Sequence, residues 1–285
     1  MRPHTTSAGL SSSARQTIAQ ATGFGYRYVR ALGHRPIGLL WILGFPAAFY
    51  VITIATFIDF GSIPESHHGA VRATTALSYG VFGAVLVSLT TVSGGLLADL
   101  ETDRTAVYRS IGVSPLADLL GRVGSAITIA LVSIGVVLLV SLFTDATYTF
   151  DPASMPIVVV AVLGSVLPWI VIAYAIAIVT DSRRYATLVA ISLALASYFA
   201  TGFNGTVPTS FTADPMWLNF LPNTLSTRVL VAHAVGLEDA AAAGLTPPSL
   251  PTARRSLGLL AGYAFGSLLA LYTIGSARLY DGGFE

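Results

Sequence analysis

The polar stretch DLETDRTAVYRSIGVSPLADLLGR, residues 99–122, separates two apolar runs, 75–98 and 123–143, that contain no charged residue. Each run is close to the roughly 20 residues that a helix needs to cross about 30 Å of hydrocarbon. Four similar runs follow the same pattern, at residues 37–58, 156–180, 186–203 and 256–277. Lipid cannot form hydrogen bonds with unpaired backbone N–H and C=O groups, so a spanning segment must be a helix or a barrel strand. The runs are long and continuously apolar, whereas barrel strands are short segments of alternating polarity, so the runs predict helices. We therefore expect an all-α integral membrane protein with six transmembrane helices.

The composition of the 285-residue chain agrees with a membrane location. Apolar residues make up 54% of it and charged residues only 10%, whereas a soluble domain carries about 25% charged residues. All 15 basic residues are arginine, which excludes a phosphate-binding loop ending in Gly-Lys-Ser/Thr and a Schiff-base lysine. The absence of cysteine excludes disulfides, thiol catalysis and cysteine metal sites. A net charge of +1 gives no argument for a nucleic-acid partner.

The arginines between the apolar runs are distributed unequally, and this predicts the orientation. Eleven lie on the side that holds both termini: Arg2, Arg15, Arg27, Arg30, Arg35, Arg104, Arg109, Arg122, Arg183, Arg184 and Arg278. Four lie on the other side: Arg72, Arg228, Arg254 and Arg255. We therefore expect a multi-pass plasma-membrane protein, and the positive-inside rule predicts that both of its termini lie in the cytoplasm.

The chain before the first span divides into two parts. Residues 1–13 are rich in Ser, Thr and Pro and are expected to be a disordered tail. Residues 14–35 have Ile18, Tyr28 and Val29 near one helical face and arginines such as Arg27 mostly on another. This pattern favours an interfacial helix with its arginines toward lipid phosphates, with a loosely helical tail as the alternative. We expect one domain over residues 14–280, followed by a cytoplasmic tail, 281–285.

The polar stretch 99–122 is longer than a simple connector requires. Thr102 or Asp103 is suited to cap a short helix that ends at Gly112, and Ser114 to cap a second helix with Pro115 at its first position. The second helix would continue into the span 123–143. We interpret the short helix as a docking element, with an ordinary solvated loop as the alternative. The carboxylates of Asp99, Glu101 and Asp103 are interpreted as a solvated helix start.

The segment 204–255 is too long to be a turn between two spans. Asn223 or Thr224 is expected to cap a helix that runs through Val235, so that two short helices fold back toward the bundle. Residues 238–251 are interpreted as an Ala- and Pro-rich linker. In the last span, Gly258, Gly262 and Gly266 form a small-residue stripe on which another helix of the bundle is expected to pack, with a subunit interface as the alternative.

Several chemical functions find little support in the residues. The six runs contain no Asp, Glu, His or Arg, which disfavours an ion-coupled secondary transporter because such proteins use intramembrane ionisable groups. No set of residues has the spacing of a catalytic triad or a metal site. An ion-coupled transporter, a membrane enzyme and a scaffold subunit of another complex remain alternatives.

Short motifs around the polar stretch resemble those of the permeases of ATP-binding-cassette (ABC) type-2 exporters. Glu101 and Arg104-Thr105, then Ser114-Pro115 and Leu119-Leu120-Gly121-Arg122, are similar to that family's acidic, Gly-Thr, Ser/Thr-Pro and Leu-Leu-Gly-basic pattern. Leu221-Pro222 with Arg228 resembles its Leu-Pro motif before the last span. The likeness covers about residues 20–280, including an interfacial helix, six spans, a coupling helix between spans 2 and 3 and returning helices before span 6. Arg104 departs from the pattern, since the family has Gly there.

This resemblance implies a transport subunit without its own ATPase site. It implies a second permease copy or paralogue and two ATPase subunits that bind ATP and Mg, with no cofactor on this chain. The substrate would be hydrophobic or amphipathic: a drug, a lipid-like or a glycan-like molecule. The implied ATPase-coupling segment comprises Glu101, Asp103, Arg104, Val107, Tyr108, Arg109, Ile111, Ser114 and Pro115. The implied pathway at the permease interface is lined by Tyr79, Phe82, Leu86, Thr90, Ile191, Leu195, Phe199 and Phe203.

Overall fold

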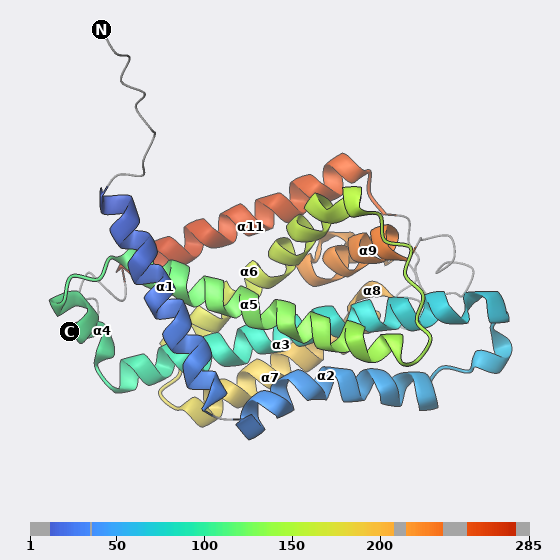
Figure 1. The fold of residues 1–285 in the computed structure, drawn as a ribbon, viewed down its shortest axis with the longest axis horizontal. Helices are drawn as coiled ribbons and strands as arrows, with labels where there is room; N and C mark the ends of the chain where they lie inside the picture. The colour runs from blue at the N-terminus through green and yellow to red at the C-terminus, as the bar shows by residue number, and fades with distance from the viewer. Residues whose placement is uncertain (1–11, 35, 208–214, 236–249, 278–285) are drawn as a thin grey trace, which may run out of the picture.

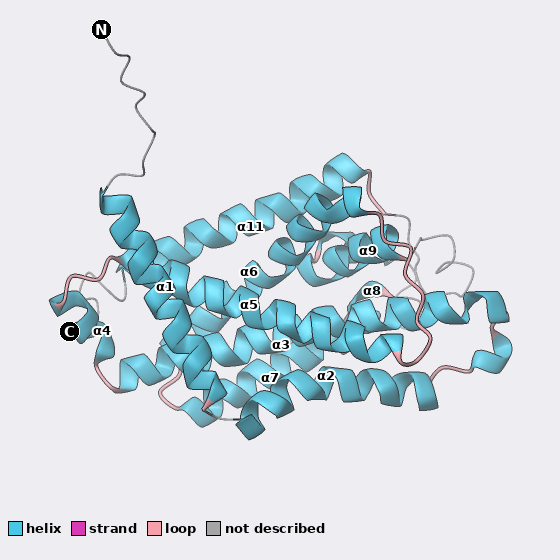
Figure 2. Cartoon of the chain, in the orientation of Figure 1, coloured by secondary structure: helices cyan, strands magenta, loops and turns pink. Residues whose placement is uncertain are grey.

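The computed structural model describes residues 12–34, 36–207, 215–235 and 250–277, and these form a helical bundle without strands (Figures 1 and 2). The expected tail at 281–285, most of the tail at 1–13 and nearly all of the linker at 238–251 lie outside these residues. We call the end of the bundle that carries the short helix α4 (Arg104–Ser110) the α4 end. The opposite end, which carries α9 (Pro222–Ala234), is called the α9 end.

Five of the described helices are long and apolar enough to cross a membrane. They are α2 (Pro36–Thr56), α3 (His68–Glu101), α5 (Pro115–Leu142), α6 (Met155–Val179) and α11 (Ala253–Gly275). Their length and composition are those of a multi-pass membrane protein. The other predicted span corresponds to α7 (Arg183–Ala200), which has 18 residues and begins with two arginines. At 1.5 Å per residue α7 is about 27 Å long, so the six-span layout stays a prediction.

Helix α3 lies at the centre of the bundle and packs against α2, α5, α6 and α7. Small residues let the neighbouring helices approach it closely. At Gly83, a Cβ atom would lie 2.5 Å from Ser133 Oγ of α5 and 2.9 Å from Pro46 Cγ of α2. The central position explains why α3 is buried along most of its length.

Helix α1 (Ser12–Gly33) packs across the start of α5, as Figure 1 shows. The backbones meet at Gly121, where a Cβ atom would lie 2.5 Å from Phe24 Cβ and 2.9 Å from the carbonyl oxygen of Ala21. A helix was expected here, and Ile18 and Val29 are exposed, as an apolar face toward lipid would be. Arg27 differs from the expectation: its side chain is 37% exposed and pairs with Asp99 instead of facing lipid phosphates. The difference arises because Arg27 finds a buried carboxylate partner in α3, which the helical pattern of α1 alone does not indicate.

The glycine stripe of α11 corrects another expectation. No described atom lies within 4 Å of a Cβ atom built at Gly258, Gly262 or Gly266, so no described helix packs closely on that face. Helix α11 contacts α6 through a different face, where a Cβ atom at Gly164 would lie 2.8 Å from the carbonyl oxygen of Leu260. Within the described part of the chain, the stripe therefore does not serve packing between helices.

The segment before α11 folds back on the bundle, as expected. A 3-10 helix, η5 (Pro215–Phe220), precedes α9, which packs against α6 and α3. The details of α9 differ from the prediction. Its N-cap position is Leu221, with Pro222 at the first helical position, and it ends at Ala234 rather than Val235. Asn223 is inside the helix and donates to Asn204 Oδ1 at 2.7 Å, so its side chain serves a tertiary contact instead of a cap.

Candidate functional site

The α4 end holds the short helix predicted in the stretch 99–122. Helix α4 is preceded by Asp103, which adopts a left-handed conformation with φ 50° and makes no side-chain cap. Gly112, with φ +73°, follows the helix and turns the chain toward α5. Ser114 Oγ accepts from the backbone N–H of Ala117 at 3.1 Å, and Pro115 begins α5, which confirms the predicted second cap.

The side chains of α4 divide into an exposed and a buried set. Val107 and Ile111 are 54% and 67% exposed. Tyr108 is buried: its ring packs edge-on against Phe24 at 4.9 Å, and its hydroxyl accepts a hydrogen bond from Arg27. Of the predicted coupling residues, Val107 and Ile111 are thus exposed, while Tyr108 anchors α4 to α1.

Asp99, near the end of α3, is the centre of a buried ion-pair network. Its side chain is 3% exposed, so the prediction of a solvated carboxylate is wrong for this residue. Tyr28 donates to Asp99 Oδ2 at 2.5 Å, and the guanidinium groups around it are those of Arg122 at 2.8 Å, Arg27 at 3.3 Å and Arg104 at 3.4 Å. Glu101 and Asp103 are exposed.

Arg122 connects Asp99 to a second buried carboxylate. Its Nε donates to Asp118 Oδ1 at 2.8 Å, one turn earlier on α5. Burying charges costs several kcal/mol per ion unless they are paired, and here each carboxylate has a guanidinium partner. Burial raises the pKa of Tyr28, the charge of Arg122 opposes this rise, and the charge of Asp99 adds to it, so the hydroxyl stays protonated as a donor. The network joins α1, α3, α5 and the start of α4.

Sequence reasoning did not find this network. Drawing the spans as charge-free runs placed Asp99, Asp118 and Arg122 outside them, although α3 and α5 continue through these residues. The available signal was the four-residue spacing of Asp118 and Arg122, which puts opposite charges on one helical face directly before an apolar run.

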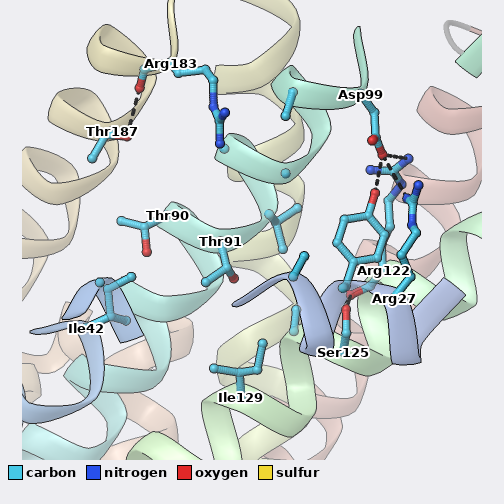
Figure 3. Close-up of a pocket in the computed structure, with 18 of the residues that line it drawn as sticks. Arg27, Ile42, Thr90, Thr91, Asp99, Arg122, Ser125, Ile129, Arg183 and Thr187 are labelled. Atoms are coloured by element: carbon cyan, nitrogen blue, oxygen red, sulfur yellow. Dashed lines mark hydrogen bonds and ion pairs between the residues drawn. The ribbon is translucent and has the colours of Figure 1, made fainter. Parts of the chain in front are cut away.

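A cavity of about 560 Å³ lies beside the network, between α1, α2, α3, α5 and α7 (Figure 3). Four arginines line it, together with the carboxylates of Asp99 and Glu101. Of the predicted site residues, Thr90, Glu101 and Arg104 are in its wall. The cavity therefore lies between the predicted coupling segment and the predicted pathway.

The predicted pathway residues toward the α9 end form an aromatic cluster around Tyr198. Tyr198 itself was not among the residues predicted from the sequence. The ring of Tyr198 lies 5.1 Å from Tyr79, 4.7 Å from Phe82 and 5.4 Å from Phe203. Phe199 joins the cluster through Phe203, at 5.6 Å. The pathway residues that the resemblance implies on α7 are Ile191, Leu195 and Phe199, and they do not include Tyr198.

The aromatic cluster is covered by helices of this same chain. Tyr79, Phe82 and Leu86 of α3 are buried, and the Tyr79 hydroxyl hydrogen-bonds to Thr53 of α2 at 2.6 Å. Ile191 and Leu195 of α7 are partly buried against the core, and Phe199 is exposed. In this conformation α2 and α7 cover the α3 face that was expected at a permease interface.

The α9 end holds a fully buried arginine. Arg228 of α9 is 0% exposed, and its Nη1 donates to Asn219, while its Nε and Nη2 have no hydrogen-bond partner among the described residues. Gly205, with φ +78°, packs over it, since a Cβ atom there would lie 3.3 Å from Arg228 Cδ. The motif that includes Arg228 is thus part of the packing between α9 and the turn α8 (Gly202–Gly205).

Comparisons with known proteins add no assignment. No family model matches the chain, and no curated protein matches it. Among the described residues there is no group of three or more His, Asp or Glu placed to hold a metal ion.

Proposed function

We propose that this protein is the membrane permease subunit of an ABC exporter, powered by a separate ATPase subunit. The observation that carries the proposal is α4: a short helix beyond two spanning helices that exposes Val107 and Ile111 and is anchored through Tyr108. A connector between α3 and α5 does not need such a helix, whereas a docking element needs exposed apolar residues on a fixed support.

The anchoring of α4 supports a mechanical role. Gln20 of α1 contacts both sides of the turn after α4, since its amide donates to the carbonyl oxygen of Gly112 at 3.5 Å and accepts from the N–H of Ser114 at 3.3 Å. Arg27 bonds both Tyr108 and Asp99. Movement of α4, driven by closure of ATP-loaded partner subunits, would pass through these contacts to α3 and α5.

The aromatic cluster supports a closed pathway between α3 and α7. Displacement of α3 relative to α7 would separate Tyr79 and Phe82 from Tyr198 and open an apolar route. The substrate would be hydrophobic or amphipathic, because the surfaces exposed by such a movement are aromatic and aliphatic. A second permease copy or paralogue would complete the route.

The remaining features follow from this assignment. The α4 end, where the described chain begins in α1 and ends after α11, faces the cytoplasm, in agreement with the excess of arginines that the sequence predicts for the side holding the termini. The location is the plasma membrane. ATP and Mg are bound by the partner subunits, so this chain is not itself an enzyme.

Photocrosslinking from α4 tests the docking step. The photoreactive amino acid p-benzoylphenylalanine is placed at Val107 or Ile111 of the full chain in its own cells, and the crosslinked products are identified by mass spectrometry. We expect a subunit with a nucleotide-binding sequence. Phe143, which is 83% exposed at the α9 end, is the matched control and should give no such product. Absence of an ATPase from the α4 products would refute the proposal.

A further inference from the structure

We propose that the cavity at the α4 end binds the anionic headgroup of a membrane amphiphile, with the amphiphile's hydrocarbon chain along the apolar wall formed by α2 and α5. The role of this amphiphile as the exported substrate rests on the proposed function, but its binding does not. The volume of about 560 Å³ is within the roughly 300–1,000 Å³ typical of small-molecule sites.

The charges of the wall favour an anion. Arg27, Arg104, Arg122 and Arg183 line the cavity, against Asp99 and Glu101. The first three arginines are engaged by Asp99. Arg183 extends from the start of α7 toward the cavity (Figure 3) and makes no ion pair with the described residues. A guanidinium in this position is suited to a phosphate or carboxylate group, which it binds by charge-assisted hydrogen bonds.

The rest of the wall is suited to an amphiphile rather than to a free anion. Hydroxyl groups of Thr90, Thr91 and Thr187 are part of the lining. Beyond them the wall is aliphatic, with Leu39 and Ile42 from α2 and Val92, Ala126 and Ile129 from α3 and α5. An inorganic anion would leave this apolar surface uncovered, whereas a hydrocarbon chain would cover it.

The position of α2 gives the amphiphile a source. The start of α2 contributes Gly38 and Leu39 to the cavity, and its neighbouring residues Ile37, Leu40 and Trp41 are 84%, 73% and 68% exposed. In a spanning helix such exposed apolar residues face lipid. The cavity is thus adjacent to the bilayer, and we assign the bilayer as the source of the ligand.

The experiment measures binding of fluorescent-tailed phosphatidylglycerol and of phosphatidylcholine with the same tail to the full chain in detergent, without nucleotide. We expect tighter binding of the anionic lipid. Arg183→Gln should reduce its affinity about fivefold, the effect of losing one partly exposed ion pair, and should leave phosphatidylcholine binding unchanged. Arg183→Lys should retain the preference. Arg184→Gln is the matched control, because Arg184 is exposed and is not in the cavity wall.

Three outcomes would overturn the inference. The first is binding without preference for the anionic lipid, and the second is a preference that persists in Arg183→Gln. The third is full displacement of the lipid by millimolar inorganic phosphate, which would mean that the site takes a free anion. Because the assay needs no ATPase, its result is separate from that of the photocrosslinking experiment: lipid binding without an ATPase partner would refute the proposed function alone.

Discussion

Arg122 Nη2 lies 2.8 Å from Asp99 Oδ2, and this contact joins α5 to α3 where both helices leave the bundle at the α4 end. Both side chains are almost completely buried. The same guanidinium binds Asp118, and the same carboxylate binds Arg27 and Tyr28 of α1. The support of α4 is therefore electrostatic as well as apolar, and its contacts can be removed one at a time.

Replacing Arg122→Met should strongly destabilise the protein. The change leaves two buried carboxylates without their closest cation, and breaking a buried pair in this way costs about 3–5 kcal/mol. Arg104→Gln is the control, since its side chain is 55% exposed and its contact with Asp99 is longer, at 3.4 Å; that loss should be at most about 1 kcal/mol. Thermal unfolding in detergent micelles measures both. Equal losses would contradict the account.

Gly121→Val should displace α1 from α5. Its Cβ atom would meet Phe24 Cβ at 2.5 Å, a distance that requires one helix to move. Gly124→Val makes the same change on the same helix, where no described atom lies within 4 Å of the new Cβ. Hydrogen exchange of the α1 amides should rise in the first variant and stay unchanged in the second. Protection of α1 in both variants would show that its packing does not depend on this contact.

Substitution by alanine should change the stability of the protein differently at two glycines of the spanning helices. Gly164→Ala should lower the unfolding temperature, because its Cβ atom would lie 2.8 Å from the carbonyl oxygen of Leu260. Gly262→Ala has open space and should be neutral or stabilising, by up to about 1 kcal/mol from helix propensity. A comparable loss at Gly262 would mean that the glycine face of α11 is covered in the assembled protein.

The orientation is testable because the chain has no cysteine, so a single substitution gives a single label. Ser62 lies at the α9 end in η1 (Phe60–Ser62), and Ser182 lies at the opposite end, directly before α7. In intact cells a membrane-impermeant maleimide should label Ser62→Cys and not Ser182→Cys, while lysis should expose both. The reverse pattern would invert the predicted orientation.

Local sequence signals predicted the parts of the structure that local chemistry determines. Ser114-Pro115 marks the start of α5 because the cap and the fixed backbone angle of proline act within one turn. Apolar runs predicted α2, α3, α5, α6 and α11, because the length and composition of a run are also local properties of the sequence. Asp103 and Gly112 located the ends of α4, although the Asp103 side chain does not form the expected cap.

Long-range partners were not predictable in this way. The burial of Asp99 depends on Arg122, which lies 23 positions away, and on α1, about 70 positions away. The inward face of α1 depends on the same carboxylate. Small-residue spacing indicates that close packing is possible, but it does not identify the helix that packs there. Gly164, an isolated glycine, contacts α11, whereas the regular stripe of α11 contacts no described residue.

The most direct test of the central claim is the ATPase activity of the complex isolated through this chain. The full chain, tagged in its own cells, is purified in mild detergent, and ATP hydrolysis is measured for the original chain and for a variant carrying Val107→Asp and Ile111→Asp. The account predicts hydrolysis that co-purifies with the original chain and is lost with the variant, while the variant chain itself remains folded. Purification of an intact, folded chain that brings no ATP hydrolysis with it would contradict the account.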